Sequence, residues 1–522
     1  MTIAAPRPAP ALAGIAVAPR RPWSSAVAAG TRHRAHTGAL ALGGYALVTL
    51  ALMAPVLASP ATRYLGSIPD AMQSIWFLSW TAHALQHGHF LLFTDALNAP
   101  AGVNLMWNTP MTLLGVVGAP ITLTAGPVVA YNALMAAAFC GSAWVAYRAV
   151  ARFCDRRAAS WAGGLLFALS PYMLAQSLGH LDLVAMVFPP LALLLGDEIL
   201  RRHRWRWWVA GGWLGVAAAA QVLVMEEVLA TVAIGAAVAL LAGGRPLLRR
   251  LGEPYAVRAL GTAAVTFAVL AAGPLAYQLA GPQVPPGLSE VASATGTDLA
   301  AFVAPTANQA VAPPPGTGLA GQLNTQSTGQ DGYVGAPMLL LLTLTVWQFR
   351  RDRTVRAVAL SGALLALLSL GPQLTVAGHL LPVPLPWRAV QHVPLLSNLV
   401  PLRLMVLADL CVALLVAHAL AHATSRRPAV LALAAAAAIT WLPALPRPST
   451  STPPPLPAAL SRSIPSGSTV QFTPPASLAD TDAMWYQLSE GFRFRLAGGY
   501  AYAAQAGVPP PGTTMTVRLP RR

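Results

Sequence analysis

The sequence predicts an all-α polytopic membrane protein with about eleven transmembrane helices, because of its composition, its long apolar runs and the placement of its arginines. Of the 522 residues, only 10% are charged and 55% are hydrophobic, and the mean hydropathy is +0.56. A soluble domain usually carries about 25% charged residues. Many of the apolar runs reach the roughly 18–20 residues that are needed to cross a bilayer.

Arginine placement predicts the orientation of these helices. The chain has no lysine, and 23 of its 33 arginines lie in six clusters between the apolar runs. Positive charge in short loops stays on the cytoplasmic side, so the clusters mark inner loops and place the N-terminus inside and the C-terminus outside. Before residue 445, only Arg63, Arg388 and Arg403 lie outside the clusters. The clusters occupy residues 7–34, 148–157, 201–206, 245–258, 350–356 and 426–427.

The net charge of +16 is distributed over these predicted inner loops. The arginines form no stripe interleaved with aromatic residues, so we expect no nucleic-acid partner. Cys140, Cys154 and Cys411 lie in or beside apolar runs and show neither disulfide nor metal-ligand spacing. The cysteines therefore predict no redox function.

Three regions are predicted along the chain. Residues 1–37 form a basic, Pro/Ala-rich arm that we expect to be disordered in the cytoplasm. Residues 38–445 form the transmembrane domain, and residues 446–522 form a Pro-rich linker and a short extracytoplasmic tail that resembles the opening of a longer domain. The first apolar run, residues 39–58, is long for a signal-peptide core and is interpreted as an uncleaved anchor, with cleavage near residues 57–61 as the alternative.

The first outer loop, residues 59–109, is expected to contain an amphipathic helix over residues 71–89 that lies along the membrane surface. The apolar stretch that follows is too long for one helix and is broken by two prolines and a glycine. If both of its halves crossed the membrane, the arginine cluster at residues 148–157 would face outward. We therefore expect residues 110–126 to be re-entrant or interfacial and residues 128–148 to form the inward span.

The remaining spans alternate without conflict. Residues 207–243 are expected to form an out-and-back pair that turns near Glu226, and residues 280–332 form a Pro/Gly-rich outer loop without a basic residue. In the tail, short strands are expected around residues 469–472 and 492–496. The other spans are predicted at residues 159–178, 181–199, 258–279, 334–349, 356–372, 398–421 and 428–445.

Unusual polar residues fall on the predicted outer side of the membrane. Asp70 follows the first span and begins the expected amphipathic helix, where an aspartate is also well suited to cap the helix N-terminus. Gln73 lies one turn further along the same helix, as a candidate for substrate binding. Asp95, in the same loop, is interpreted as a turn residue.

Two further pairs of polar residues stand out. His180 and Asp182 lie at the outer junction of two predicted spans, where they could share a metal ion or bind a sugar, or form a solvated hairpin tip. Glu226 and Glu227 are adjacent carboxylates in an apolar stretch, which is costly unless they face a cavity or a partner. At a turn the cost is smaller, so a purely structural role stays open for this pair.

Arg403 opposes the trend of positive charge on the inner side. A guanidinium binds phosphate oxygens in a bidentate fork, and snorkelling to the lipid headgroups is the alternative. The sequence has no P-loop, dinucleotide fingerprint, nucleophile elbow or zinc-protease helix. The outer polar residues are therefore the candidates for chemistry.

The layout resembles the GT-C superfamily of integral-membrane glycosyltransferases. Members of that superfamily have an early outer loop with an acidic residue and juxtamembrane helices, many spans, and often a C-terminal extracytoplasmic domain. Short motifs across residues 40–445 are also similar to uncharacterised bacterial membrane proteins of this type. The family often has a pair of acids where this chain has Pro69 before Asp70. The motifs are Pro69–Asp70, Trp76–Trp80, Asn98–Pro100, Ser170–Tyr172, Gly179–Leu181, Gly332–Gly335, Leu370–Pro372 and Pro401–Arg403.

This resemblance implies a hexosyl- or pentosyltransferase at the outer face of the bacterial inner membrane. Its donor would be a polyprenyl-phosphate sugar, presented by the lipid bilayer, and its acceptor a glycan, a lipid or a protein. Asp70 would be the general base that deprotonates the acceptor hydroxyl, and Arg403 would hold the departing lipid phosphate. The residues expected to orient sugar hydroxyls or a divalent cation are Gln73, His180, Asp182, Glu226 and Glu227.

Two other function classes stay open from the sequence. A transporter or flippase of lipid-linked or anionic solutes would also use intramembrane carboxylates and broken helices. A non-catalytic assembly protein of the cell envelope is the third alternative.

Overall fold

The computed structural model describes residues 31–284, 296–314, 317–319, 331–393, 399–423, 428–478, 480–504 and 514–518, together with Leu323 and Leu396. Within the helices that begin at Thr31 and Pro428, side chains are described from residues 38 and 430 onward. Most of the predicted cytoplasmic arm, much of the predicted loop 280–332 and the arginine pair at 426–427 lie outside the described residues.

The chain is mostly helical, and six of its described helical runs are long and apolar enough to cross a membrane. This confirms a helical protein of the membrane type, whereas the count of eleven spans and the orientation stay predictions. Three shorter apolar helices accompany the long ones, at Thr112–Ala125, Ala336–Gln348 and Val430–Thr440. The six candidate spans are Gly38–Leu57, Pro127–Val150, Leu181–Arg202, Trp207–Leu251, Pro254–Ala280 and Pro401–His422.

The region predicted as one span over residues 159–178 is two helices, which corrects that prediction. Helix α5 (Arg157–Ala168) ends before Ser170, and α6 (Pro171–Gln176) begins one residue later. Pro171 at the first helical position lacks an N–H, and the Ser170 side chain accepts a hydrogen bond from the Met173 amide at 3.4 Å. The start of a new helix at Pro171 interrupts the predicted span, although the residues around it are mostly apolar.

The region predicted as an out-and-back pair over residues 207–243 lies within α9 (Trp207–Leu251), whose helical backbone is interrupted at Met225 and again at Gly244, by kinks rather than by loops. Its backbone leaves helical geometry at Met225 (φ −167°, ψ 113°), beside the predicted turn. The Gln221 side chain donates to the Met225 carbonyl at 3.0 Å and so satisfies an acceptor that the kink releases. The kink places Glu226 and Glu227 at the join.

Helix α2 (Asp70–His87) occupies the predicted amphipathic region and ends at Gly88, whose φ of +72° is accessible to glycine. Its apolar side chains do not form a membrane-facing stripe. Twelve of its residues, including Trp76 and Trp80, are buried, and the helix packs on α3 (Thr112–Ala125) and α18 (Asp482–Ser489). The pattern that suggested membrane contact is explained by burial within the protein.

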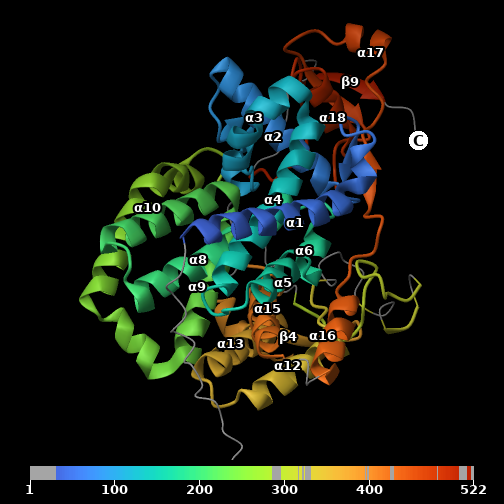
Figure 1. The fold of residues 1–522 in the computed structure, drawn as a ribbon. Coiled ribbons are helices and arrows are strands. Elements are labelled where there is room, and N and C mark those ends of the chain that lie inside the picture. The colour runs from blue at the N-terminus through green and yellow to red at the C-terminus, as the bar shows by residue number, and fades with distance from the viewer. Residues whose placement is uncertain are drawn as a thin grey trace, which may run out of the picture.

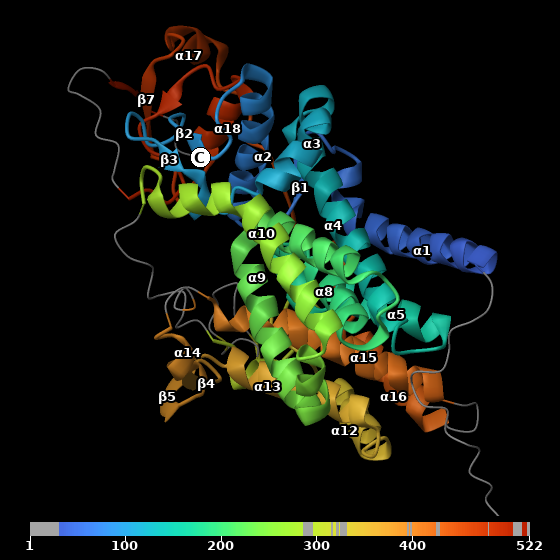
Figure 2. The same cartoon turned by 90° about the vertical axis from the view of Figure 1, so that its left-hand side faces the viewer.

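The C-terminal tail packs against the first outer loop (Figures 1 and 2). Strand β6 (Ser449–Ser451) pairs antiparallel with β1 (Arg63–Leu65), directly after the first span. Strand β7 (Thr469–Thr473) lies between and parallel to β8 (Arg495–Leu496) and β9 (Thr514–Arg518). The two strands predicted in the tail are therefore confirmed as β7 and β8.

One buried glutamine joins the tail to the first loop. The Gln487 side chain on α18 donates to the carbonyls of Ala96 (2.7 Å) and Phe494 (2.9 Å) and accepts from the Trp76 indole N–H at 2.9 Å. The Leu496 amide donates to the Ala96 carbonyl, and the Asn98 amide to the Gly498 carbonyl. These bonds hold the tail beside α2.

The remaining elements complete the helical body. Strands β2 and β3 form one hairpin, and β4 and β5 a second hairpin, before the last spans. These elements are α1 (Thr31–Leu57), β2 (Phe93–Thr94), β3 (Val103–Asn104), η1 (Leu105–Trp107), α4 (Pro127–Val150), α7 (Leu181–Val184), α8 (Phe188–Asp197), η2 (Glu198–Arg202), α10 (Pro254–Ala280), η3 (Leu299–Phe302), α12 (Ala336–Gln348), α13 (Arg353–Ser369), β4 (Gln373–Val376), β5 (His379–Pro384), α14 (Trp387–Val390), η7 (Pro401–Leu404), α15 (Met405–His422), α16 (Pro428–Thr440) and α17 (Ala458–Ser463).

Several predicted inner loops contact one another through their arginines. Arg152 forms an ion pair with Glu198 at 3.4 Å, and Arg202 donates to the Arg152 carbonyl at 2.7 Å. Arg250 donates to the Leu200 carbonyl at 2.9 Å. The arginine clusters at 148–157, 201–206 and 245–258 therefore meet, as expected for loops on one side of a membrane.

Candidate functional site

A polar cavity of about 280 Å³ lies where several predicted outer segments meet. Its walls come from the start of α2, the loop before α3, the α6–α7 junction, the kink of α9 and the start of η7. These segments are distant in sequence, so only the fold brings them together. The lining residues are Asp70, Gln73, Ser74, Phe77, Asn108, Thr109, Met111, His180, Asp182, Met225, Glu227, Val400 and Arg403.

Asp70 is the first residue of α2, and its carboxylate lies at the cavity wall. Its Oδ1 accepts a hydrogen bond from the Tyr500 hydroxyl at 2.8 Å, and its Oδ2 lies 3.6 Å from His180 Nε2. Pro69, the residue at the N-cap, has no side-chain cap bond. The Asp70 carboxylate thus contacts functional groups from the tail and from the α6–α7 junction.

His180 and Asp182 flank the start of the short helix α7, on the wall beside Asp70. The His180 imidazole is 28% exposed, and Asp182 is buried. Both side chains line the cavity, so the junction does not form a solvated hairpin tip. The imidazole nitrogen and the carboxylate oxygens supply acceptors for sugar hydroxyls.

Glu227 and Arg403 also line the cavity and form an ion pair with each other. One carboxylate oxygen of Glu227 contacts the Arg403 guanidinium, and the other accepts from the Val400 amide at 2.8 Å. The kink of α9 aims Glu227 at η7, where Pro401 begins the turn that bears Arg403. The guanidinium and the Val400 N–H together hold an anionic group, which in this structure is the Glu227 carboxylate.

Glu226 lies away from the cavity although it neighbours Glu227. Its carboxylate accepts a hydrogen bond from the Gln278 side chain of α10 at 3.0 Å. Gln278 also donates to the Met106 carbonyl at 3.1 Å. Of the adjacent acids, only Glu227 therefore lines the candidate site, and Glu226 bridges α9 to α10.

The C-terminal tail closes another side of the site. The Gln73 side chain donates to the Tyr500 carbonyl at 2.6 Å. Asn108 donates to the Tyr502 carbonyl at 2.8 Å and accepts from the Tyr502 amide at 2.5 Å. Asp95 forms an ion pair with Arg495 at 3.3 Å, with both side chains about half exposed. The Asp95 carboxylate therefore helps to dock the tail and lies outside the cavity.

The arrangement combines a carboxylate, an anion-binding guanidinium and several hydrogen-bonding groups. Glu227, Asp182 and Asp70 contribute negative charge, and Arg403 contributes positive charge. No group of three or more histidine, cysteine or acidic side chains suited to a metal ion occurs among the described residues. A base and a phosphate-binding cation in one cavity suit the transfer of a group from a phosphate leaving group to a hydroxyl.

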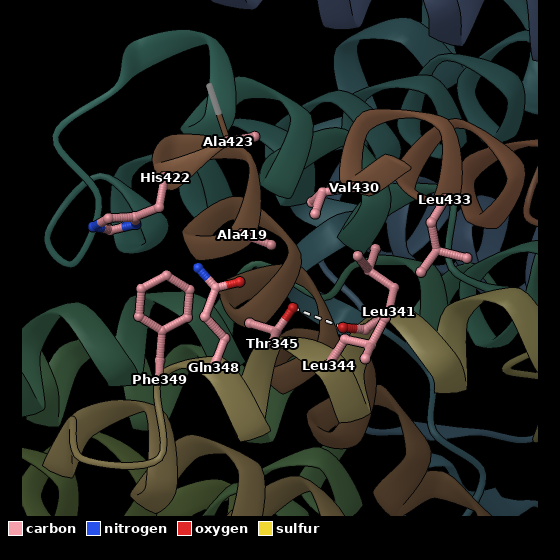
Figure 3. A pocket seen from close by; sticks show the side chains of 10 residues that line it. All are labelled: Leu341, Leu344, Thr345, Gln348, Phe349, Ala419, His422, Ala423, Val430 and Leu433. Atoms are coloured by element: carbon pink, nitrogen blue, oxygen red, sulfur yellow. Dashed lines mark hydrogen bonds between the residues drawn. The ribbon is translucent and has the colours of Figure 1, made fainter. Parts of the chain in front are cut away.

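A second pocket lies at a different place and offers no such chemistry. It holds only about 20 Å³ between α12, α15 and α16, and apolar side chains such as Leu341, Leu344 and Leu433 form most of its wall (Figure 3). The polar side chains in its wall are Thr345, Gln348 and His422, and none of its lining residues has a carboxylate. A space of this size holds little more than a water molecule.

Sequence reasoning missed several polar residues near the site. Tyr500 was visible only as part of a Gly-Gly-Tyr motif in the tail, and its contact with Asp70 spans 430 positions. Asp409 is fully buried within α15, and an acid inside an apolar run is a recognisable signal. Asp331 accepts from the Gln176 side chain, and burial raises the pKa of the Asp331 carboxyl well above its usual range.

Comparisons with solved structures give partial likenesses to an oligosaccharyltransferase from Archaeoglobus fulgidus. Its apo form matches with a TM-score of 0.45 at 12% identity over 90% of this chain and 65% of that chain. The form tethered to an acceptor peptide matches with 0.41 at 12% identity over 89% and 64%. The complex of this enzyme, AglB, with an inhibitory peptide and a dolichol-phosphate matches with 0.42 at 13% identity over 90% and 65%.

The chain thus spans about 65% of the length of the oligosaccharyltransferase. Likenesses with such TM-scores do not bear on the site or its chemistry. No curated protein matches the sequence. The model of a protein family described as "Domain of unknown function (DUF6311)" matches residues 41–444. Because this match covers well over half of the chain, the protein belongs to the DUF6311 family.

Proposed function

We propose that this protein is an integral-membrane glycosyltransferase that moves a hexose or pentose from a polyprenyl-phosphate donor to a hydroxyl acceptor. The observation that carries this proposal is the shared cavity of Asp70, His180, Asp182, Glu227 and Arg403. Four chain segments supply these five residues, which are the polar groups that such a transfer needs. The acceptor is a glycan, a lipid or a protein.

In this mechanism Asp70 acts as the general base. Its carboxylate takes the proton from the acceptor hydroxyl while that oxygen attacks the anomeric carbon of the donor sugar. The bond from that carbon to the phosphate oxygen breaks, and polyprenyl phosphate leaves with the bonding electron pair. Attack opposite to the leaving group inverts the anomeric configuration.

Arg403 binds the phosphate of the donor and stabilises the negative charge that grows on it. In the free protein its guanidinium contacts Glu227, so the incoming phosphate exchanges with that carboxylate. The Val400 N–H, which now bonds Glu227 at 2.8 Å, is a second donor for the same anion. A guanidinium and a backbone N–H together favour a phosphate over a neutral group.

The other cavity residues orient the sugar. His180, Asp182 and Gln73 present acceptors and donors to its hydroxyls, and a divalent cation is an alternative way for the carboxylates to do so. The Glu226 carboxylate bonds Gln278 and does not line the cavity, so we assign Glu226 no direct contact with the sugar.

The proposal also includes a topology. About eleven spans with the N-terminus inside place this cavity at the extracytoplasmic face of a bacterial inner membrane. A lipid-linked donor then reaches the cavity from the bilayer itself. The domain boundaries belong to this proposal as well, with residues 1–37 as a cytoplasmic arm, 38–445 as the transmembrane domain and 446–522 as the outer tail.

The assay is release of polyprenyl phosphate in vesicles that contain the protein and its native acceptors. The donors are polyprenyl-phosphate mannose, glucose and arabinose, each radiolabelled in the prenyl chain. We expect Asp70→Asn to lower turnover by roughly 10²–10⁴-fold, the usual contribution of a general base, while donor binding is kept. Asp95→Asn is the matched control, since this acid of the same loop pairs with Arg495 outside the cavity. Unchanged turnover in Asp70→Asn would remove Asp70 as the base.

A further inference from the structure

A short segment of the C-terminal tail, residues 498–502, lies against the candidate site. Its backbone is attached on both sides of Tyr500. The Asn98 amide donates to the Gly498 carbonyl at 3.0 Å, and Asn108 forms two hydrogen bonds with the Tyr502 backbone. Gly499 has a φ of +156°, and a Cβ there would lie 2.9 Å from a Leu97 methyl group. Glycine thus lets the segment approach the first loop closely.

The Tyr500 side chain reaches from this segment to Asp70. Its hydroxyl donates to Asp70 Oδ1 at 2.8 Å. Burial, followed by the charge and the hydrogen bond of Asp70, raises the pKa of the Tyr500 hydroxyl. The hydroxyl therefore keeps its proton near neutral pH and acts as a donor.

The bond fixes one oxygen of the carboxylate and leaves the other beside the cavity. Asp70 Oδ2 lies near His180 Nε2, at 3.6 Å, which is longer than a hydrogen bond. Without Tyr500, rotation about the Asp70 side chain would exchange the two oxygens. A base must present its lone pair within hydrogen-bond reach of the proton that it takes.

We propose that Tyr500 is a positioning residue, which holds the Asp70 carboxylate so that Oδ2 faces the acceptor hydroxyl. This inference rests on the proposed function and extends it, because it makes the C-terminal tail part of the transferase site. The Tyr500 hydroxyl can be removed without removing the contacts that dock the tail. The docking contacts of the 498–502 segment use its backbone, including the Tyr500 carbonyl that accepts from Gln73.

Tyr500→Phe removes the hydroxyl and keeps the ring and the backbone bonds. We expect kcat to fall about tenfold, with KM for the donor unchanged, because Arg403 and the sugar-binding groups are not affected. A tail that is merely loosened would instead raise KM.

The experiment compares Tyr500→Phe and Tyr502→Phe in the full chain, each with native Asp70 and with Asp70→Asn. Tyr502 is the matched control because its side chain is half exposed and its contacts with Asn108 use the backbone. The assay is polyprenyl phosphate release from the radiolabelled sugar donors, measured for kcat and KM. We expect an effect of Tyr500→Phe with native Asp70, none of Tyr502→Phe, and none of either on the residual rate of Asp70→Asn.

Wild-type kcat in Tyr500→Phe, with Asp70→Asn inactive, would overturn the role of Tyr500 and leave the proposed function standing. Full activity of Asp70→Asn would overturn both. A further loss when Tyr500→Phe is added to Asp70→Asn would also overturn the inference, because Tyr500 would then act without the carboxylate.

Discussion

The ion pair between Glu227 and Arg403 leads to a counterintuitive prediction: removal of a charge from the site should strengthen binding of polyprenyl phosphate. The perturbation is Glu227→Gln. The cavity walls bear the carboxylates of Asp70, Asp182 and Glu227 against the guanidinium of Arg403, so an incoming phosphate meets an excess of negative charge. In addition, Glu227 occupies the guanidinium that the phosphate needs.

The magnitude follows from the geometry of the pair. A phosphate bound by Arg403 would lie roughly 6 Å from the Glu227 carboxylate, and two unit charges at this distance interact by about 3 kcal/mol at an effective dielectric constant of about 20. The side chains are 21% (Arg403) and 16% (Glu227) exposed, so solvent screens part of this energy. A net gain of about 1.4 kcal/mol remains, which corresponds to about a tenfold lower Kd.

The assay is equilibrium binding of radiolabelled polyprenyl phosphate to the purified protein in lipid nanodiscs. Asp95→Asn is the matched control, because this change also removes one carboxylate, which pairs with Arg495 and does not line the cavity. We expect tighter binding in Glu227→Gln and wild-type binding in Asp95→Asn. Weaker binding in Glu227→Gln would refute this reasoning, since Glu227 would then serve to orient Arg403 for the phosphate.

Two further predictions concern the docking of the tail and the pH dependence of stability. Gln487→Ala removes the hydrogen-bond partner of Trp76 Nε1 and of the Phe494 carbonyl, at about 1–3 kcal/mol for each group, whereas the Ala96 carbonyl keeps the Leu496 amide. Limited proteolysis should cut the tail faster than in the control Gln471→Ala, whose side chain bonds the Phe472 carbonyl of its own strand; equal rates would contradict this. Burial, with the charges of His87 and His89, lowers the pKa of His83 to about 4. The unfolded chain binds this proton near pH 6.5, so stability should fall as pH drops from about 6.5 to about 4. His83→Gln should show a smaller loss in thermal unfolding, and a loss equal to wild type would exclude His83.

Much of the fold follows from local patterns in the sequence. The helix over Asp70–His87, the break at residues 126–127 and the tail strands β7 and β8 all lie close to their predicted positions. Hydrophobic periodicity, prolines and glycines determine these features within a few residues. Whether a helix is covered by lipid or by protein depends on its partners, and so the burial of α2 under α3 and α18 could not be predicted from its own residues.

The composition of the site was partly predictable, whereas its geometry was not. Residues expected on one face of the membrane do meet in the cavity, because the arginine pattern sorts loops by side. The separation of Glu226 from Glu227 depends on the backbone angles of Met225. The contact of Tyr500 with Asp70 depends on how the tail folds back over the first loop. Neither feature can be recognised from the neighbouring residues in the sequence.

The most direct test of sugar transfer at this site uses a donor with one isotope in the sugar and another in the prenyl chain. The protein is placed in sealed vesicles with its acceptors, and wild type is compared with Asp70→Asn. We expect the two labels to separate, with sugar on the acceptor and prenyl label in polyprenyl phosphate, and we expect this separation to be lost in Asp70→Asn. Movement of both labels together across the membrane would contradict the transferase and identify a flippase.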